Sequence, residues 1–283
     1  MGFGKIGVIG AGLMGNGIAQ VCAAAGLSVI MVDVAEAALK RGLDTIRGNL
    51  DRAASKGKIS EADRDATLKR ISTTTSYDAL KGADIVIEAA TENLDLKLRI
   101  MKQIDELVGP ETIIASNTSS ISITQLAAMV SNPSRFIGMH FFNPVPVMAL
   151  VELIRGLQTS DQVHANALAF AKAIGKTPIT AQNRPGFAVN RILCPMINEA
   201  IFTLQEGIAT AEDIDIGMKL GCNHPIGPLA LADLIGLDTL LSVMNVFYEG
   251  FNDPKYRVPT LLKEMVAAGR LGRKSGSGFY NYK

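Results

Sequence analysis

The sequence predicts an α/β protein with a doubly wound parallel sheet followed by an all-helical C-terminal domain. Short apolar runs rich in β-branched residues alternate with amphipathic helical segments as far as residue 180. Beyond the segment 182–186 (QNRPG) only helical patterns follow. The length of 283 residues also exceeds the ~250 at which single cores usually divide. We therefore expect two domains, residues 1–184 and 185–283, joined by a hinge near 183–186.

The first 33 residues have the order of a dinucleotide-binding unit. An apolar run over 6–9 ends in a G-x-G-x-x-G turn, a helix follows over 13–25, and the next apolar run ends in Asp33. The motif glycines are Gly10, Gly12 and Gly15. They would allow a tight turn, backbone approach to a pyrophosphate and close helix packing, while Asp33 would bind ribose hydroxyls and repel a 2′-phosphate. This Rossmann-type order predicts NAD rather than NADP, and a glycine turn without a ligand is the alternative.

The strand and helix patterns continue to alternate through the first domain. A helix over 36–50 runs into a polar, basic segment, and Ser60 opens another helix with acids in its first turn. Ser122 and Gln125 form a capping box. The other helices expected are 91–108, 122–130 and 160–174, and the strands are 71–76, 84–88, 112–115, 136–142, 149–154 and 177–180. The second domain is expected to contain helices over 187–206, 211–220, 229–248 and 259–268.

Composition and charge narrow the classes of partner. The chain is 48% hydrophobic with a net charge of +1, which gives no reason to expect nucleic acid or a membrane surface as partner. No run of about 18 apolar residues occurs, and the first strand pattern leaves no room for a signal peptide. The three cysteines are far apart and the three histidines have no metal-ligand spacing. We expect a cytoplasmic protein without a metal.

Two polar residues interrupt apolar strands and are candidates for catalysis. His140 lies within FIGMHFF, where a strand of the nucleotide-binding domain ends, and Glu152 lies within MALVELI. A proline-containing loop joins the two strands, so the side chains are expected to be neighbours, with the carboxylate orienting the imidazole as a general base. The alternatives are a core histidine bonded to a backbone carbonyl and a solvent-facing glutamate on an edge strand.

Asn190 is a third polar residue in an apolar setting. It shares a helix face with Cys194, Ile197 and Ile201, where an amide requires a hydrogen-bond partner. That partner is either a substrate carbonyl or a neighbouring backbone group. In the loop before the capping box, Ser119 has no structural role that the sequence reveals.

With these residues identified, the whole chain resembles the short-form 3-hydroxyacyl-CoA dehydrogenases. Beyond the glycine turn, the resemblance covers residues 115–120 (ASNTSS), 138–144 (GMHFFNP), 185–191 (PGFAVNR) and 272–280 (GRKSGSGFY). It implies that His140 is the general base, that Glu152 orients it, and that Ser119 and Asn190 bind the reacting oxygen. Asn183 departs from the pattern, because the family commonly has Asp there.

The resemblance also implies a set of cofactor contacts. These are Gly10, Gly12, Leu13, Met14, Gly15, Asp33, Ala90, Glu92, Lys97, Asn117, Ser119, Asn143 and Lys274. From the sequence itself, Glu92 fits equally well as a first-turn helix acid and Lys97 as an exposed helix cation. Of the basic residues near 47–58, Lys56 matches a lysine that contacts acyl-CoA in the family. We add Arg52 as a phosphate partner and Asn49 as a further substrate contact.

The function implied is NAD-dependent, reversible oxidation of (S)-3-hydroxybutyryl-CoA to acetoacetyl-CoA. The helical domain is expected to close over the sheet domain and to pair with its copy in a homodimer, as in the family. A gulonate-type sugar-acid dehydrogenase, or one acting on another β-hydroxy acid, is the alternative enzyme. A non-enzymatic nucleotide-binding role would not need His140 and Glu152.

Overall fold

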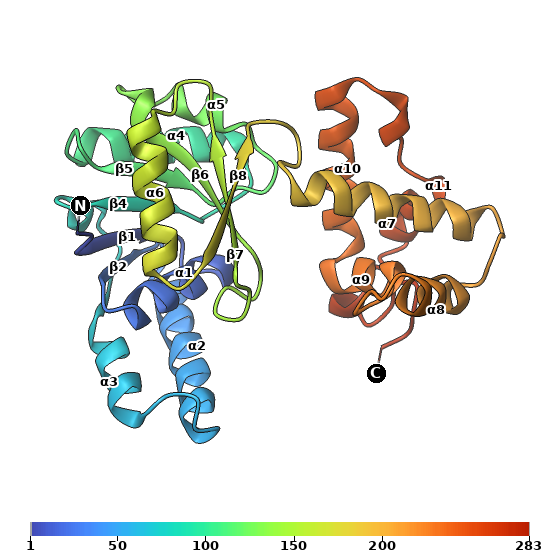
Figure 1. Ribbon diagram of the computed structural model, residues 1–283, viewed down its shortest axis with the longest axis horizontal. Helices are drawn as coiled ribbons and strands as arrows, with labels where there is room; N and C mark the ends of the chain where they lie inside the picture. Colours follow the sequence, from blue (N-terminus) through green and yellow to red (C-terminus); the bar gives the residue numbers. More distant parts are fainter. Residues whose placement is uncertain (1, 283) are drawn as a thin grey trace. The chain divides into compact units, whose positions relative to one another are not determined.

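The computed structural model describes residues 2–282, and the chain forms two compact units. One unit ends at Arg184 and the other begins at Pro185 (Figure 1). The first contains every strand of the sheet, and the second is helical.

The first unit is built on one eight-stranded sheet in the order β3-β2-β1-β4-β5-β6-β7-β8. The strands are β1 (Lys5–Ile9), β2 (Ser28–Val32), β3 (Ile71–Thr74), β4 (Ile85–Glu88), β5 (Ile113–Ser116), β6 (Phe136–Phe141), β7 (Leu150–Arg155) and β8 (Thr177–Gln182). Because β1 to β6 run parallel, their carboxyl ends share one edge of the sheet, where ligands bind in open α/β folds.

Helices cover both faces of this sheet (Figure 1). The helices are α1 (Leu13–Ala24), α2 (Glu36–Ser55), α3 (Glu61–Lys69), α4 (Leu94–Leu107), α5 (Ile123–Ala127) and α6 (Asp161–Ala173), with short 3-10 turns η1 (Tyr77–Leu80) and η2 (Pro133–Arg135). Apolar side chains of α1, α2 and α6 form one core cluster with β1, β4 and β6. The predicted doubly wound α/β class is confirmed.

One strand departs from the predicted parallel sheet. β7 runs antiparallel to β6, and β8 then runs parallel to β7. The connection over 142–149 contains no helix, and a parallel crossover needs a dozen or more residues, usually with a helix. The chain therefore reverses between β6 and β7.

Several element boundaries also differ from the expectation. α2 continues to Ser55, through the first part of the segment expected to be polar and irregular. α4 starts at Leu94 because the Asn93 side chain accepts a hydrogen bond from the Leu96 amide. The Ser122 hydroxyl accepts from the Gln125 amide at 3.3 Å, which is one half of the predicted capping box, and α5 ends at Ala127 rather than at 130.

The second unit contains five helices among its described residues. They are α7 (Val189–Gln205), α8 (Ala211–Gly221), α9 (Pro228–Ile235), α10 (Leu237–Phe251) and α11 (Thr260–Ala267), with 3-10 turns η3 (Pro254–Tyr256) and η4 (Arg273–Ser275). The single helix predicted over 229–248 is wrong. Gly236 has φ +99°, which ends α9, and α10 leaves at 98° to it.

Two buried carboxylates hold the C-terminal segment on this unit. Asp233 accepts hydrogen bonds from the amides of Phe279 and Tyr280 and from the Tyr282 hydroxyl, at 2.9–3.0 Å. Asp215 accepts from the amides of Leu229 and Ala230 and from the Tyr280 hydroxyl. Phe279 and Tyr280, at the end of the family-like stretch 272–280, therefore have a structural role.

No single helix within residues 2–282 has the length and apolar composition needed to cross a membrane, and only α9 and α10, taken together as a bent pair, pass by length and composition.

Candidate active site

The glycine turn between β1 and α1 has the geometry that its sequence predicts. Gly10 has φ +98°, and a Cβ on Gly15 would lie 1.8 Å from the Gly10 carbonyl oxygen, so neither position accommodates a side chain. A Cβ on Gly12 would meet nothing within 4 Å, so this glycine faces open space. α1 begins without a side-chain cap or a first-turn acid. Its first amides are therefore available to the pyrophosphate of a dinucleotide.

Asp33 follows β2 at the same edge. One carboxylate oxygen accepts from the Ala11 amide at 2.9 Å and the other from the Ala35 amide at 3.1 Å. A cavity of about 420 Å³ opens beside it, lined also by Tyr77, Ala90 and Arg99. Burial raises the pKa of the Tyr77 hydroxyl, and the carboxylates of Glu88 and Asp33 raise it further. These residues fit an adenosine ribose with its hydroxyls directed at Asp33.

Tyr77 and Arg99 were not predicted as members of this site. Tyr77 lies in a 3-10 turn after β3, and Arg99 lies on α4, so neither belongs to a local motif. Ala90, which was predicted, packs against the glycine turn, because a Cβ on Gly10 would lie 2.7 Å from the Ala90 Cα.

Glu88, at the end of β4, and Lys97 of α4 form a buried ion pair. The Lys97 Nζ lies 2.5 Å from one carboxylate oxygen of Glu88, which also accepts from the Ser116 hydroxyl at 2.8 Å. The second oxygen of Glu88 accepts from the Ala90 amide. The Lys97 side chain is 1% exposed, so the alternative of an exposed helix cation is wrong. The pair joins the ends of β4 and β5 to α4.

Glu92 organises the loop that carries Ser119. Its carboxylate accepts from the Thr118 hydroxyl at 2.7 Å and from the Ser119 amide at 3.1 Å. In the same loop, the Asn117 side chain accepts from the Phe141 amide at 2.9 Å, next to His140. Both residues were predicted as cofactor contacts, and both fix loops at the edge where the dinucleotide turn lies.

His140 and Glu152 face each other directly across β6 and β7. The register pairs the two residues, and Nδ1 of the imidazole lies 2.7 Å from a carboxylate oxygen. Glu152 is fully buried on an interior strand, so the alternative of a solvent-facing edge residue is wrong. His140 is 7% exposed, and the Phe142 ring lies 4.6 Å from the imidazole, centroid to centroid.

This arrangement determines the chemistry of the imidazole. An ionised carboxylate only accepts hydrogen bonds, so the bond assigns the proton to Nδ1 and makes Nε2 the basic nitrogen. The carboxylate also stabilises the imidazolium that forms when Nε2 takes a proton. The pair is therefore suited to general acid–base catalysis.

The other predicted residues lie on several elements. Asn143 is exposed in the loop after β6, and Asn190 is half-buried in the first turn of α7. The guanidinium of Arg191, the next residue, stacks on the rings of Phe251 and Tyr256. Lys274, expected near the cofactor, forms an ion pair with Asp238 of α10 at 2.6 Å. Asn190 and Lys274 both belong to the second unit.

Three of the predicted substrate residues lie near the end of α2, and two of these three are in contact. The Arg52 guanidinium donates to the Asn49 side-chain oxygen, and the Asn49 amide donates to Gln20 of α1 at 3.1 Å. Lys56 follows directly after α2 and is exposed. A polar contact therefore links α1, the helix that follows the glycine turn, to the basic segment at the end of α2.

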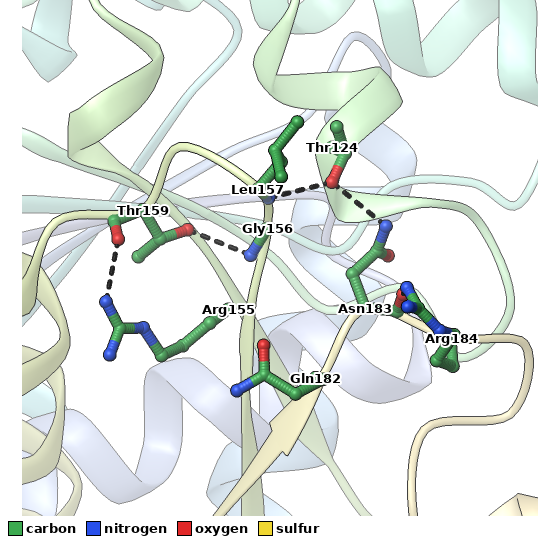
Figure 2. Close-up of a pocket in the computed structure, with 8 residues that line it drawn as sticks. All are labelled: Thr124, Arg155, Gly156, Leu157, Thr159, Gln182, Asn183 and Arg184. Atoms are coloured by element: carbon green, nitrogen blue, oxygen red, sulfur yellow. Dashed lines mark hydrogen bonds between the residues drawn. The ribbon is translucent and has the colours of Figure 1, made fainter.

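A second polar cavity, of about 400 Å³, lies where β7 and β8 end (Figure 2). None of the predicted site residues lines it. Asn183 accepts there from the Ile123 amide at 2.9 Å and donates to the hydroxyls of Ser122 and Thr124. An Asp at this position can accept but cannot donate. The departure from the family pattern therefore changes the direction of two hydrogen bonds that hold the start of α5.

The glycine turn, Asp33 and the buried imidazole–carboxylate pair, all at one sheet edge, define an NAD-dependent dehydrogenase. The comparisons agree over nearly the whole chain. Residues 5–184 match the family described as "3-hydroxyacyl-CoA dehydrogenase, NAD binding domain", and residues 186–282 match "3-hydroxyacyl-CoA dehydrogenase, C-terminal domain". The chain belongs to the 3-hydroxyacyl-CoA dehydrogenase family, and the predicted enzyme class and cofactor are confirmed.

Three relatives illustrate how similar the chain is to this family. It is 52% identical to a probable 3-hydroxybutyryl-CoA dehydrogenase of Bacillus subtilis, over 99% of this chain and 97% of the relative. It is also 52% identical to the 3-hydroxybutyryl-CoA dehydrogenase of Bradyrhizobium diazoefficiens, over 99% and 95%. The crystal structure of (S)-3-hydroxybutyryl-CoA dehydrogenase from Ralstonia eutropha superposes with a TM-score of 0.98 at 65% identity, covering 100% of both chains.

Proposed function

We propose that this protein catalyses the NAD-dependent, reversible oxidation of (S)-3-hydroxybutyryl-CoA to acetoacetyl-CoA. The observation that carries the proposal is the buried His140–Glu152 pair, 2.7 Å apart, at the sheet edge that also carries the dinucleotide turn. The similar proteins named above supply the substrate class, because their names give it.

In this proposal His140 moves the proton of the reaction. During oxidation Nε2 takes the proton of the C3 hydroxyl while the C3–H bond breaks and the carbonyl forms. Bound NAD supplies the hydride acceptor. Glu152 holds the ring in one orientation and stabilises the imidazolium, and in the reverse direction the same nitrogen returns the proton to the oxygen.

Ser119 and Asn190 are proposed to donate hydrogen bonds to the reacting oxygen. Ser119 is supported by its position, since the Glu92 carboxylate fixes its amide in the loop after β5. Asn190 lies in the first turn of α7. The next side chain, Arg191, stacks on the rings of Phe251 and Tyr256 and so fixes this turn within the second unit. Donors fixed before the reaction stabilise the developing charge without reorganising.

The cofactor contacts proposed from the first unit fall into two groups. The glycine turn with Leu13 and Met14 would bind the pyrophosphate, and Asp33 would bind the adenosine ribose. Ala90, Glu92, Asn117, Ser119 and Asn143 would surround the nicotinamide half. Lys97 is 1% exposed, so its proposed contribution acts largely through Glu88. Lys274 would approach from the second unit.

The CoA moiety is proposed to lie along the end of α2. Its phosphates need cations, and Arg52 and Lys56 are exposed there, with Asn49 one turn before Arg52. Residues 1–184 then act as the NAD-binding domain and residues 185–283 as the substrate and dimerisation domain, whose closure excludes water.

A homodimer through the second unit is part of the proposal. Ile208, Ile216 and Leu220 are 68%, 52% and 82% exposed on this unit, and their burial against a second copy would remove apolar surface from water. A mass measurement in solution tests it, and a monomer at micromolar concentration would contradict it. The protein is also proposed to act in the cytoplasm, without nucleic-acid or membrane partners.

The test of the proposed reaction is NADH consumption with acetoacetyl-CoA, compared with free acetoacetate and with a sugar acid. We expect turnover with the thioester and little with the other two, because the basic end of α2 would be unused without CoA. The absence of turnover with acetoacetyl-CoA would contradict the proposal.

A further inference from the structure

The loop over 142–149 joins the strand of His140 to the strand of Glu152. Pro146 and Val147 are exposed in it, and Val147 reaches 75% exposure, so most of the loop makes little contact with the core. Val145 is the exception at 2% exposure. It packs on α1, where a Cβ on Gly17 would lie 2.8 Å from the Val145 Cβ. One side of the loop therefore packs against α1, the helix that follows the glycine turn.

The Lys176 side chain holds the other side of the same loop. Lys176 directly precedes β8 and is 8% exposed. Its Nζ donates to the carbonyl oxygens of Val145 at 2.5 Å and Met148 at 2.8 Å. The same turn is closed internally, since the amides of Val147 and Met148 both donate to the Pro144 carbonyl. Lys176 thus connects the two ends of one tight turn.

The local helix does not explain why a lysine stands at this position. The Lys176 backbone amide donates to the Ala171 carbonyl and ends α6 without using the side chain. Within residues 2–282 no carboxylate pairs with its ammonium, and burial lowers the pKa of this group. Burying an ammonium whose hydrogen-bond acceptors are two neutral carbonyl oxygens is costly. A hydrocarbon side chain would fill the space without that cost, so the two hydrogen bonds are the property that distinguishes lysine here.

We propose that Lys176 is a positioning residue for the catalytic pair. By fixing the turn over 144–148 it sets where β7 begins relative to β6, and so holds the Glu152 carboxylate against His140. This inference rests on the proposed function. A displacement of about 1 Å in a catalytic group can lower the rate about 100-fold, even when it originates away from the reacting atoms.

The experiment compares Lys176→Met with Lys172→Met in acetoacetyl-CoA reduction. Lys172 lies in the last turn of α6, is exposed, and its substitution removes the same charge. We expect Lys176→Met to lower kcat about 100-fold, with much smaller changes in both KM values. Lys172→Met should match the wild type. With NADH deuterated at both C4 positions, the isotope effect on kcat should rise in Lys176→Met, because hydride transfer becomes the slow step.

A conservative variant separates positioning from folding. Lys176→Arg keeps a cation with several donors and is expected to recover most of the lost kcat. If Lys176→Met does not fold, Lys176→Gln replaces it, and a loss between those of Met and Arg is expected. A kcat for the Met or Gln variant equal to that of Lys172→Met, or an unchanged isotope effect, overturns the inference. Absence of wild-type turnover with acetoacetyl-CoA would instead overturn the proposed function.

Discussion

Glu88 and Glu152 are both fully buried and belong to the same sheet, yet they have different surroundings. Glu88 is bonded by Lys97, Ser116 and the Ala90 amide. Glu152 lies opposite an imidazole, whose second nitrogen can accept a proton, whereas an ammonium can only donate. The partner of a buried carboxylate, more than its burial, therefore distinguishes a candidate for proton transfer from a structural ion pair.

The largest expected effect is the loss of kcat on substitution of His140, the partner of Glu152. His140→Gln should lower kcat on the order of 10²- to 10⁴-fold, because no other group replaces the base. NADH binding, followed by fluorescence, should persist, since the glycine turn is unchanged.

A matched control for this variant is His164→Gln. His164 lies on α6 and bonds the Thr180 hydroxyl at 2.9 Å, apart from the catalytic pair. It should keep wild-type kcat. Full activity in His140→Gln would show that the base is another residue.

Disruption of the Glu88–Lys97 ion pair should lower the free energy of unfolding. Lys97→Met leaves the Glu88 carboxylate buried without its cation, which typically costs about 3–5 kcal/mol. Urea unfolding measures the loss. Adding Glu88→Gln in the same chain should recover part of it, because the uncompensated charge is removed. Equal stability of Lys97→Met and the wild type would contradict the assignment of this pair as structural.

Asp33 extends the comparison to a carboxylate held by backbone amides alone. Asp33→Ala should weaken NADH binding roughly 10- to 100-fold, since hydrogen bonds to charged groups contribute about 1.5–3 kcal/mol. NADPH binding should change less, because a 2′-phosphate is repelled by this carboxylate. The ratio of the two dissociation constants is the measurement, and an unchanged ratio would remove Asp33 from the ribose site.

The sequence predicts those site residues that lie in a local motif or that interrupt a regular apolar pattern. The order of strand, glycine turn, helix and acid predicted the position of Asp33, and the interruption of two apolar strands singled out His140 and Glu152. Their pairing was predicted because one short loop joins the two strands. Asn190 stood out as an amide on an apolar helix face, and the family resemblance added its role, together with that of Ser119, in binding the reacting oxygen.

The sequence was insufficient where the partner is distant along the chain. On its helix Lys97 has the pattern of an exposed cation, and only the packing of α4 beneath β4 and β5 brings it to Glu88. Tyr77 and Arg99 meet in the cavity beside Asp33 for the same reason. The break at Gly236 has a local signal, a glycine in the middle of the apolar stretch predicted as one helix.

The direct register of His140 against Glu152 limits how this gene can change by insertion and deletion. Successive residues of a strand point to opposite faces, so a shift of β7 by one residue would turn the carboxylate away from the imidazole. Length changes between residues 142 and 149 are tolerable only when the added or lost residues leave that register intact. Natural length variants of this loop should therefore be rarer than variants of equally exposed loops elsewhere in the chain.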